Sequence, residues 1–292
     1  MALIKSIIIL IIGFALLMKG ADYFVEGSSS VAKQLHVPSM IIGMTIVAMG
    51  TSLPECAVSV TASLTGNNSL AVSNVVGSNI FNLMVVCGAC ALFAPLTIKK
   101  DTLKKEFPLS IICAVLLMVL GYVGMLLGHL DGGVFLLIFA AYLIWMIGSA
   151  KKARAAHKES QMMLEEGELV DEEIQILPLW KCALFIVGGM IAIKFGGDFV
   201  VDSASALASA FGLSQTLIGL TIVAMGTSLP ELVTSIVAAR KNEVDMALGN
   251  VIGSNIFNIL FVLGIAAAIS PVAFIMENVI DIVILIAMSI MV

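Results

Sequence analysis

Long apolar runs separated by short polar connectors follow one another along this chain. A helix needs about 20 mostly apolar residues to cross the hydrocarbon core of a bilayer. The runs are continuously apolar rather than alternating, which favours helices over the strands of a β-barrel. The pattern predicts nine spans, at residues 4–29, 39–64, 70–96, 107–127, 132–149, 179–205, 213–239, 244–269 and from about 279 onward.

A polar stretch at residues 151–175 falls between the fifth and sixth predicted spans. It begins basic and ends acidic, and it lacks the D-x-D-x-D-G spacing of a calcium-binding loop, so we interpret it as a solvated linker. The predicted organisation is therefore a first membrane repeat at residues 1–150, a linker at 151–178 and a second membrane repeat at 179–292.

Residues 43–82 recur 176 positions later as residues 219–258, with 23 of the 40 positions identical. Both copies contain G-T-S-L-P-E and, further on, G-S-N-I-F-N. Polar, helix-breaking sequence repeated inside hydrophobic spans is typical of transporters built from two homologous halves. Five spans is an odd number, so the second half enters the membrane from the opposite side. The predicted fold is an all-α polytopic membrane protein with two inverted-topology five-helix repeats.

The same offset predicts a tenth span that ends near residue 325, which is residue 149 plus 176. The chain stops at Val292, about 14 residues into the ninth span, and this is too few to cross a bilayer. We therefore expect the sequence to be a fragment of a longer protein.

Composition and charge agree with a membrane protein. The chain is 60% hydrophobic and only 12% charged, with a mean hydropathy of +1.11, which excludes a soluble globular domain. Twelve lysines and arginines fall in connectors on one side of the predicted spans, against Lys5 alone on the other. The basic side is expected to be cytoplasmic, with the linker inside and the N-terminus outside. Short connectors suggest a prokaryotic inner membrane.

The proline of each G-T-S-L-P-E motif should break its helix. Pro54 and Pro230 lack an N–H group and collide with the carbonyl four residues earlier, so carbonyls near residues 48–51 are expected to lose their partners. Such groups are tolerated in a bilayer only inside protein or beside water. Carbonyls, hydroxyls and one carboxylate within a single turn favour a hard cation, namely Na⁺, Ca²⁺ or Mg²⁺.

Glu55 and Glu231 are the acidic residues of these motifs. A charged carboxylate at the centre of a bilayer costs on the order of 3 kcal/mol. Two facing carboxylates also repel one another, so at least one would take up a proton unless a cation lies between them. A divalent cation neutralises both at once, and we expect the two glutamates to meet around one.

The G-S-N-I-F-N motif places a serine and an asparagine four residues apart, on one helix face. The glycine that opens each motif is expected to let this face approach a neighbouring helix closely. The residues concerned are Ser78, Asn82 and Gly77 in the first copy and Ser254, Asn258 and Gly253 in the second. The acidic residues of the first and sixth spans (Asp22, Glu26, Asp198 and Asp202) are interpreted as interfacial charges, with gating or a water-lined entry as the alternative. Lys19 and Lys194 are expected to snorkel or to pair with Asp22 and Asp198.

Taken together, the paired motifs resemble the α-repeats of the cation/Ca²⁺ antiporter superfamily and are most similar to those of prokaryotic Na⁺/Ca²⁺ exchangers. The resemblance covers essentially the whole chain. It implies ten spans, with ions bound among spans two, three, seven and eight. It also implies that spans one and six form a sliding pair that opens the site to either side of the membrane.

The resemblance also implies a role for each matching residue. Glu55 and Glu231 would be ligands shared by Ca²⁺ and Na⁺. The remaining ligands would be the carbonyls of Thr51 and Thr227 at the calcium site, Ser52, Ser228, Ser78 and Ser254 with the carbonyls of Ala48 and Ala224 at flanking Na⁺ sites, and Asn82 and Asn258 at the centre. Family members with Asp at the last of these positions are associated with K⁺ dependence or a protonatable ligand. Because Asn258 stands there, we expect no K⁺ requirement.

The expected function is therefore antiport of Na⁺ against Ca²⁺ by alternating access, with three Na⁺ per Ca²⁺ implied by the resemblance. The alternatives are an antiporter of H⁺ against Ca²⁺ or another divalent cation, and a cation channel. No H-E-x-x-H, G-x-S-x-G or phosphate-binding loop is present, so no enzyme activity is expected. We expect a monomer in a lipid bilayer that uses no cofactor, transports Ca²⁺ and Na⁺ and binds no nucleic acid.

Overall fold

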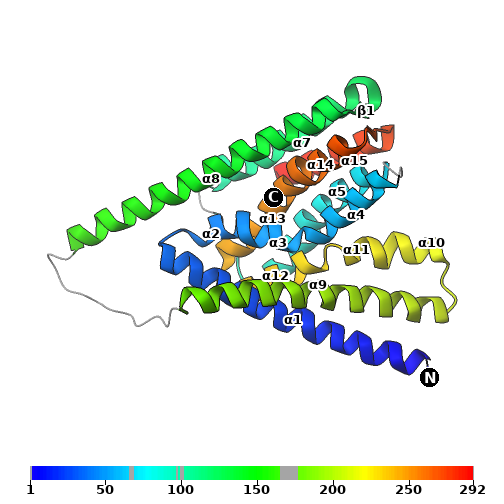
Figure 1. Ribbon diagram of the computed structural model, residues 1–292, viewed down its shortest axis with the longest axis horizontal. Coiled ribbons are helices and arrows are strands. Elements are labelled where there is room, and N and C mark those ends of the chain that lie inside the picture. The colour runs from blue at the N-terminus through cyan, green and yellow to red at the C-terminus, as the bar shows by residue number, and fades with distance from the viewer. Residues whose placement is uncertain (1, 66–68, 97, 99–101, 165–176, 292) are drawn as a thin grey trace.

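The computed structural model of the protein describes residues 2–65, 69–96, 98, 102–164 and 177–291. The described residues are almost entirely helical (Figure 1). Six of their helices are long and apolar enough to cross a membrane, and a helix pair bent by 48° between Thr51 and Leu53 makes a seventh if the pair counts as one span. The predicted all-α, polytopic architecture is confirmed.

In the first half, α1 (Ala2–Leu35) is followed by a broken span of α2 (Ser39–Ile42), α3 (Ala48–Thr51) and α4 (Leu53–Leu64). Next come α5 (Ser69–Phe81), α6 (Cys87–Phe93), α7 (Phe107–Tyr122) and α8 (His129–Leu164). α8 continues to Leu164, so the first part of the segment predicted as a linker from residue 151 is helical. The last part of that linker, residues 165–176, lies outside the described residues.

In the second half, α9 (Leu179–Ala210) precedes α10 (Gln215–Ile218), α11 (Ala224–Gly226) and α12 (Leu229–Arg240). The chain continues through α13 (Val244–Phe257), α14 (Leu263–Ile269) and α15 (Met276–Met291). The predicted span at 213–239 is therefore divided among three helices. Two short strands, β1 (Leu126–Leu127) and β2 (Val272–Ala273), pair antiparallel and join a connector of the first half to one of the second.

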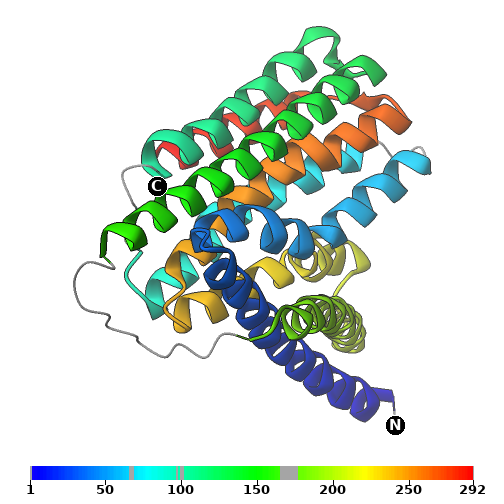
Figure 2. The same cartoon turned by 60° about the vertical axis from the view of Figure 1, so that its left-hand side comes forward.

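Helices α1 and α9 form an antiparallel pair that lies along one side of the molecule (Figures 1 and 2). Glycines spaced seven residues apart on α1 face small residues on α9: Gly13 faces Gly196, Gly20 faces Gly189, and Gly27 faces Cys182. A Cβ added at Gly20 would lie only 2.9 Å from the backbone nitrogen of Ile193. Because glycine has no side chain, the backbones of the two helices can pack directly against each other along the pair.

Four π-helical turns interrupt the spans that carry the repeated motifs: Gly43–Val47, Asn82–Val86, Gly219–Val223 and Asn258–Val262. They form two pairs separated by the repeat offset. In the first pair, the hydroxyls of Thr45 and Thr221 donate to the carbonyls of Ile41 and Leu217, each at 2.6 Å. These hydroxyls compete with the backbone for the acceptor of an ordinary helical turn. Such π-turns are frequent at functional sites.

The centre of the remaining helices is α13, whose residues Met246–Phe257 are all buried. Its Gly249 and Gly253 lie against the broken span of the first half, and a Cβ at Gly253 would be 2.5 Å from Cα of Met44. The expected close approach is thus confirmed at Gly253. At Gly77 the expectation is wrong, because a Cβ built there meets no atom within 4 Å. The two halves therefore pack differently around matching motifs.

Candidate ion-binding site

The two motif glutamates lie in the first turns of α4 and α12, directly after the breaks in their spans. Ser52 (φ −84°, ψ 12°) and Ser228 (φ −93°, ψ 4°) leave helical geometry, and the prolines that follow occupy first-turn positions where no N–H group is needed. The side chains of Glu55 and Glu231 are fully buried. The predicted helix break at each motif is confirmed.

The predicted loss of a partner at the Ala48 carbonyl is wrong. This carbonyl accepts a hydrogen bond from the backbone nitrogen of Ser52 at 3.1 Å, and the hydroxyl oxygen of Thr51 lies 3.3 Å from it. The α3 turn closes normally because helical geometry is lost only at Ser52, after α3 ends at Thr51. The matching carbonyl of Ala224 accepts from the hydroxyl of Thr227 at 3.5 Å.

Serines of each repeat reach across to the glutamate of the other repeat. The Ser52 hydroxyl donates to Oε1 of Glu231 at 2.7 Å, and the Ser228 hydroxyl donates to Oε1 of Glu55 at 3.1 Å. Ser78 also donates to Oε1 of Glu55 at 3.2 Å, and its Oγ lies 3.0 Å from that of Ser228. The structure thus brings the two inverted motifs into one buried cluster.

Several oxygens of the segments that meet here have no hydrogen-bond partner among the described residues. They are Oε2 of Glu55, Oε2 of Glu231, Oδ1 of Asn82, Oδ1 of Asn258 and Oγ of Ser254, all in buried side chains. Buried polar atoms nearly always have partners, so orphaned acceptors gathered on facing segments need an explanation. Carboxylate and amide oxygens are ligands that Na⁺ and Ca²⁺ prefer. The donor set fits a hard cation carried as cargo.

The other sequence-predicted ligands are placed unevenly. Thr51 is buried and its hydroxyl donates to Oδ1 of Asn250 at 3.1 Å. Ala48 is fully buried, whereas its repeat partner Ala224 is exposed and Thr227 is partly exposed. A contact from α8 covers the first-half segment, because the Tyr142 hydroxyl donates to the Met44 carbonyl at 3.1 Å. The second-half segment, α11, therefore forms the open flank of the cluster.

Sequence reasoning missed a layer of supporting residues. Asn74 donates to the Glu55 carbonyl at 3.4 Å and to Ser59 at 3.1 Å, while Asn250 donates to the Glu231 carbonyl at 3.5 Å and to Ser235 at 2.9 Å. Both pairs hold the turn that carries the glutamate. The sequence could have indicated this supporting role. Each of these asparagines and serines recurs unchanged 176 positions later, although most residues around them differ between the two copies.

A further pair, Asn79 and Asn255, joins the two repeats directly. The Asn79 amide donates to the Asn255 carbonyl at 3.1 Å, and the Asn255 amide donates to the Asn79 carbonyl at 3.3 Å. Both side chains also accept hydrogen bonds, from Asn258 and from Asn82 respectively, each at 3.1 Å. These residues belong to the G-S-N-I-F-N motifs, but no role was predicted for them from the sequence.

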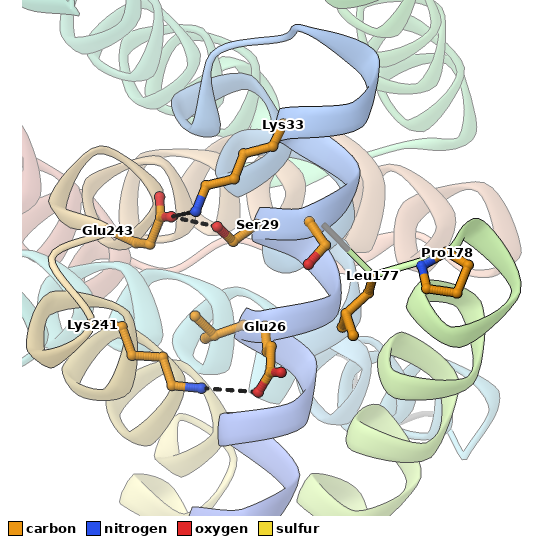
Figure 3. A pocket seen from close by; sticks show the side chains of 9 residues that line it. Glu26, Ser29, Lys33, Leu177, Pro178, Lys241 and Glu243 are labelled. Atoms are coloured by element: carbon orange, nitrogen blue, oxygen red, sulfur yellow. Dashed lines mark hydrogen bonds and ion pairs between the residues drawn. The ribbon is translucent and has the colours of Figure 1, made fainter. Parts of the chain in front are cut away.

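A separate cavity of about 560 Å³ lies where α1 meets the turn between α12 and α13 (Figure 3). Lys241 from this turn lies 3.7 Å from Oε2 of Glu26, and Lys33 of α1 lies 3.7 Å from Oε1 of Glu243. Ser29 also donates to Glu243. These contacts tie α1 to the second half, so the interfacial charge at Glu26 has a partner that the sequence did not indicate.

The expected pairing of the span lysines is confirmed. Lys19 lies 3.9 Å from Asp22, and Lys194 lies 2.5 Å from Asp198. Asp22 also faces Lys241, whose Nζ donates to the Asp22 carbonyl at 2.9 Å.

Comparison with known proteins identifies the family. The family model described as sodium/calcium exchanger protein matches residues 5–148 and 181–292. Inner membrane protein YrbG of Escherichia coli (strain K12) is 39% identical over 267 residues, which cover 90% of this chain and 79% of that protein. Sodium/calcium exchanger MaX1 of Methanosarcina acetivorans is 33% identical, with 92% of this chain and 84% of that protein covered.

A solved structure agrees with these relatives. The sodium-calcium exchanger NCX_Mj, soaked with 10 mM Na⁺ and 10 mM Sr²⁺, matches with a TM-score of 0.83 at 30% identity and covers 99% of this chain and 89% of its own. The matches extend over both repeats, and they show that the chain belongs to the sodium/calcium exchanger family.

Proposed function

We propose that the protein is a secondary active antiporter that exchanges Na⁺ for Ca²⁺ by alternating access. The observation that carries this proposal is the buried pair Glu55 and Glu231, whose Oε2 atoms both lack a partner in the part of the chain that the structure describes. Two carboxylates balance the charge of one Ca²⁺. They can instead bind Na⁺ in overlapping positions, but they cannot serve both cargoes together, and this competition would couple the two fluxes.

The other proposed ligands form two groups, one at the central position and one at the flanking Na⁺ positions. Asn82 and Asn258 would present amide carbonyl oxygens at the centre, beside the carbonyls of Thr51 and Thr227. The flanking Na⁺ positions would be formed by Ser52, Ser78, Ser228 and Ser254 with the carbonyls of Ala48 and Ala224. Ca²⁺ takes six to eight oxygen ligands, so neutral oxygens must complete a shell that the two glutamates begin.

The arrangement of α1 and α9 supports alternating access. Glycine contacts along the pair make it one packed unit, while ion pairs at Lys33 and Lys241 connect it to the rest of the molecule. We propose that this unit moves past the cluster and exposes it to each side in turn. The expected orientation has the N-terminus outside and the linker in the cytoplasm of a prokaryotic cell.

The test is ⁴⁵Ca²⁺ uptake into proteoliposomes that contain the purified protein. One set holds Na⁺ inside and is diluted into Na⁺-free medium, and another is given an acid interior without Na⁺. Uptake driven by the Na⁺ gradient alone is the expected result. Uptake driven only by the proton gradient would replace Na⁺ by H⁺ as the coupling ion. A current far above the turnover of a transporter would indicate a channel.

A further inference from the structure

Four asparagines form a hydrogen-bonded set between the two repeats, in which Asn79 and Asn255 donate to each other's backbone carbonyl and close a ring. Asn82 and Asn258 each donate to one side chain of this pair. Asn79 and Asn82 come from the G-S-N-I-F-N segment at the end of α5, and Asn255 and Asn258 come from the corresponding segment at the end of α13. All four side chains are at most 1% exposed. We call this set the asparagine ring.

The orientation of each amide in the ring follows from backbone carbonyls, which can only accept hydrogen bonds. Asn79 lies 3.1 Å from the Asn255 carbonyl, so the atom that faces this carbonyl must be its NH₂ group. Its Oδ1 then faces Asn258, which must donate with its own NH₂ group, at 3.1 Å. The Oδ1 atom of Asn258 is thereby turned away from the ring, and it has no partner.

The same reasoning holds in the other half of the ring. The NH₂ group of Asn255 faces the Asn79 carbonyl at 3.3 Å, and its Oδ1 accepts from Asn82 at 3.1 Å. Oδ1 of Asn82 therefore also lacks a partner. The Asn258 amide lies 3.5 Å from Oγ of Ser78, a residue that donates to Glu55, so the ring adjoins the glutamate cluster.

We propose that Asn79 and Asn255 are positioning residues that hold the amides of Asn258 and Asn82 with their oxygens toward the transported cation. A rotation of either amide by 180° would present an NH₂ group, which carries partial positive charge and cannot bind a cation. The ring removes this alternative before an ion arrives. The inference rests on the proposed function, because it gives the two amide oxygens a cation to bind.

The test is a double-mutant cycle that makes the orientation of the amide irrelevant. Asn79→Leu removes the acceptor that holds Asn258, and loss of an outer partner of a metal ligand typically weakens affinity about 10- to 100-fold. Asp has an oxygen on both sides, so a rotation no longer matters. In an Asn258→Asp background, Asn79→Leu should therefore change Ca²⁺ affinity less than about threefold. Affinity is measured as equilibrium ⁴⁵Ca²⁺ binding to purified protein.

The outcomes separate the possibilities. Equal losses in both backgrounds would show that Asn79 only supports the fold, and no loss in either would show that it has no role. Asn278→Leu is the matched control, since it removes a buried amide that contacts Ser73, and it should leave affinity unchanged. If Asn79→Leu does not fold, Asn255→Leu with and without Asn82→Asp gives the same cycle in the other half. Absence of Ca²⁺ binding by the unaltered protein would instead refute the proposed function.

Discussion

Glu55 and Glu231 occupy matching positions but have different surroundings. Oε1 of Glu55 accepts hydrogen bonds from Ser78 and Ser228, whereas Oε1 of Glu231 accepts from Ser52. By repeat symmetry Ser254 should serve Glu231 as Ser78 serves Glu55, yet its hydroxyl has no partner. The cluster is therefore tightly bonded on one side, and on the other it keeps a hydroxyl available for a ligand.

Neutralising either glutamate should abolish Ca²⁺ transport. Glu55→Gln and Glu231→Gln each remove one negative charge and one anionic ligand from a fully buried site, so a divalent cation would be left without charge balance. We expect Na⁺-driven ⁴⁵Ca²⁺ uptake to fall to the level of empty liposomes. Glu277→Gln, at an exposed position in the first turn of α15, should transport normally. Uptake that survives in Glu55→Gln would refute the proposed ligand role.

Substitutions of Ser78 and Ser254 should have different effects on the stability of the ion-free protein. Ser78 contacts Glu55, Ser228 and Asn258, so Ser78→Ala should lower the free energy of unfolding by about 1–3 kcal/mol. Ser254→Ala removes a buried hydroxyl without a partner among the described residues, so ion-free stability should be unchanged or rise by up to about 1–3 kcal/mol. Thermal unfolding without added ions measures this difference. A similar loss in both variants would contradict the assigned contacts.

At the scale of elements, much of the fold follows from the sequence. Apolar runs predict where the spans lie, and the prolines predict both helix breaks. The repeat offset predicts that Glu55 and Glu231 meet. The π-helical turns could not be obtained in this way, because a π-turn changes the hydrogen-bond partner of the backbone without changing the apolar pattern. The threonine hydroxyls that accompany two of these turns become informative only when their acceptors are known.

The contrast between Gly77 and Gly253 has a similar origin. The sequence is the same at both motifs, but only Gly253 faces the backbone of another helix. The difference depends on where each half places its broken span. A local pattern does not encode that placement. The supporting asparagines at positions 74 and 250 were hidden for the same reason, since an asparagine inside an apolar run does not reveal which carbonyl it serves.

The packing of α1 against α9 should be sensitive to a single methyl group. Gly189 lies in the contact, where an added Cβ would be 2.7 Å from the Gly20 carbonyl, while its neighbour Gly188 has no atom within 4 Å of that position. Gly189→Ala should therefore separate the helices and lower the melting temperature. Gly188→Ala should be neutral or stabilising by up to about 1 kcal/mol, the difference in helix propensity. Equal melting temperatures in the two variants would contradict the close contact.

At the scale of the molecule, exposure is unequal on the two sides of the cluster. The first-half segment is covered by α13 and by Tyr142 of α8, whereas Ala224 on α11 is exposed. The ion pairs of Lys33 and Lys241 lie near the opposite end of α1 from the N-terminus (Figures 1 and 3). Each of these partly exposed pairs contributes at most about 1 kcal/mol, so they can break during a conformational change.

Exchange of three Na⁺ for one Ca²⁺ would move one net positive charge with the sodium. Each charge gains or loses about 2.3 kcal/mol per 100 mV of membrane potential. Uptake of Ca²⁺ into Na⁺-loaded proteoliposomes should therefore speed up when the interior is made positive with K⁺ and valinomycin, and slow down when it is made negative. Uptake that does not respond to either potential would indicate exchange of two Na⁺ per Ca²⁺.

The cross-repeat hydrogen bonds can form only after the second half of the chain has been synthesised. The bonds of Ser52, Thr51 and Ser78 to the second half join residues 150–199 positions apart. At about 5–20 residues per second, synthesis of the 176 residues between Glu55 and Glu231 takes roughly 9 to 35 s. During this interval the first motif must reside in or beside the membrane without its partners. The nascent first half is therefore the stage at which a membrane chaperone or the insertion machinery would have to protect the motif of the proposed ion site.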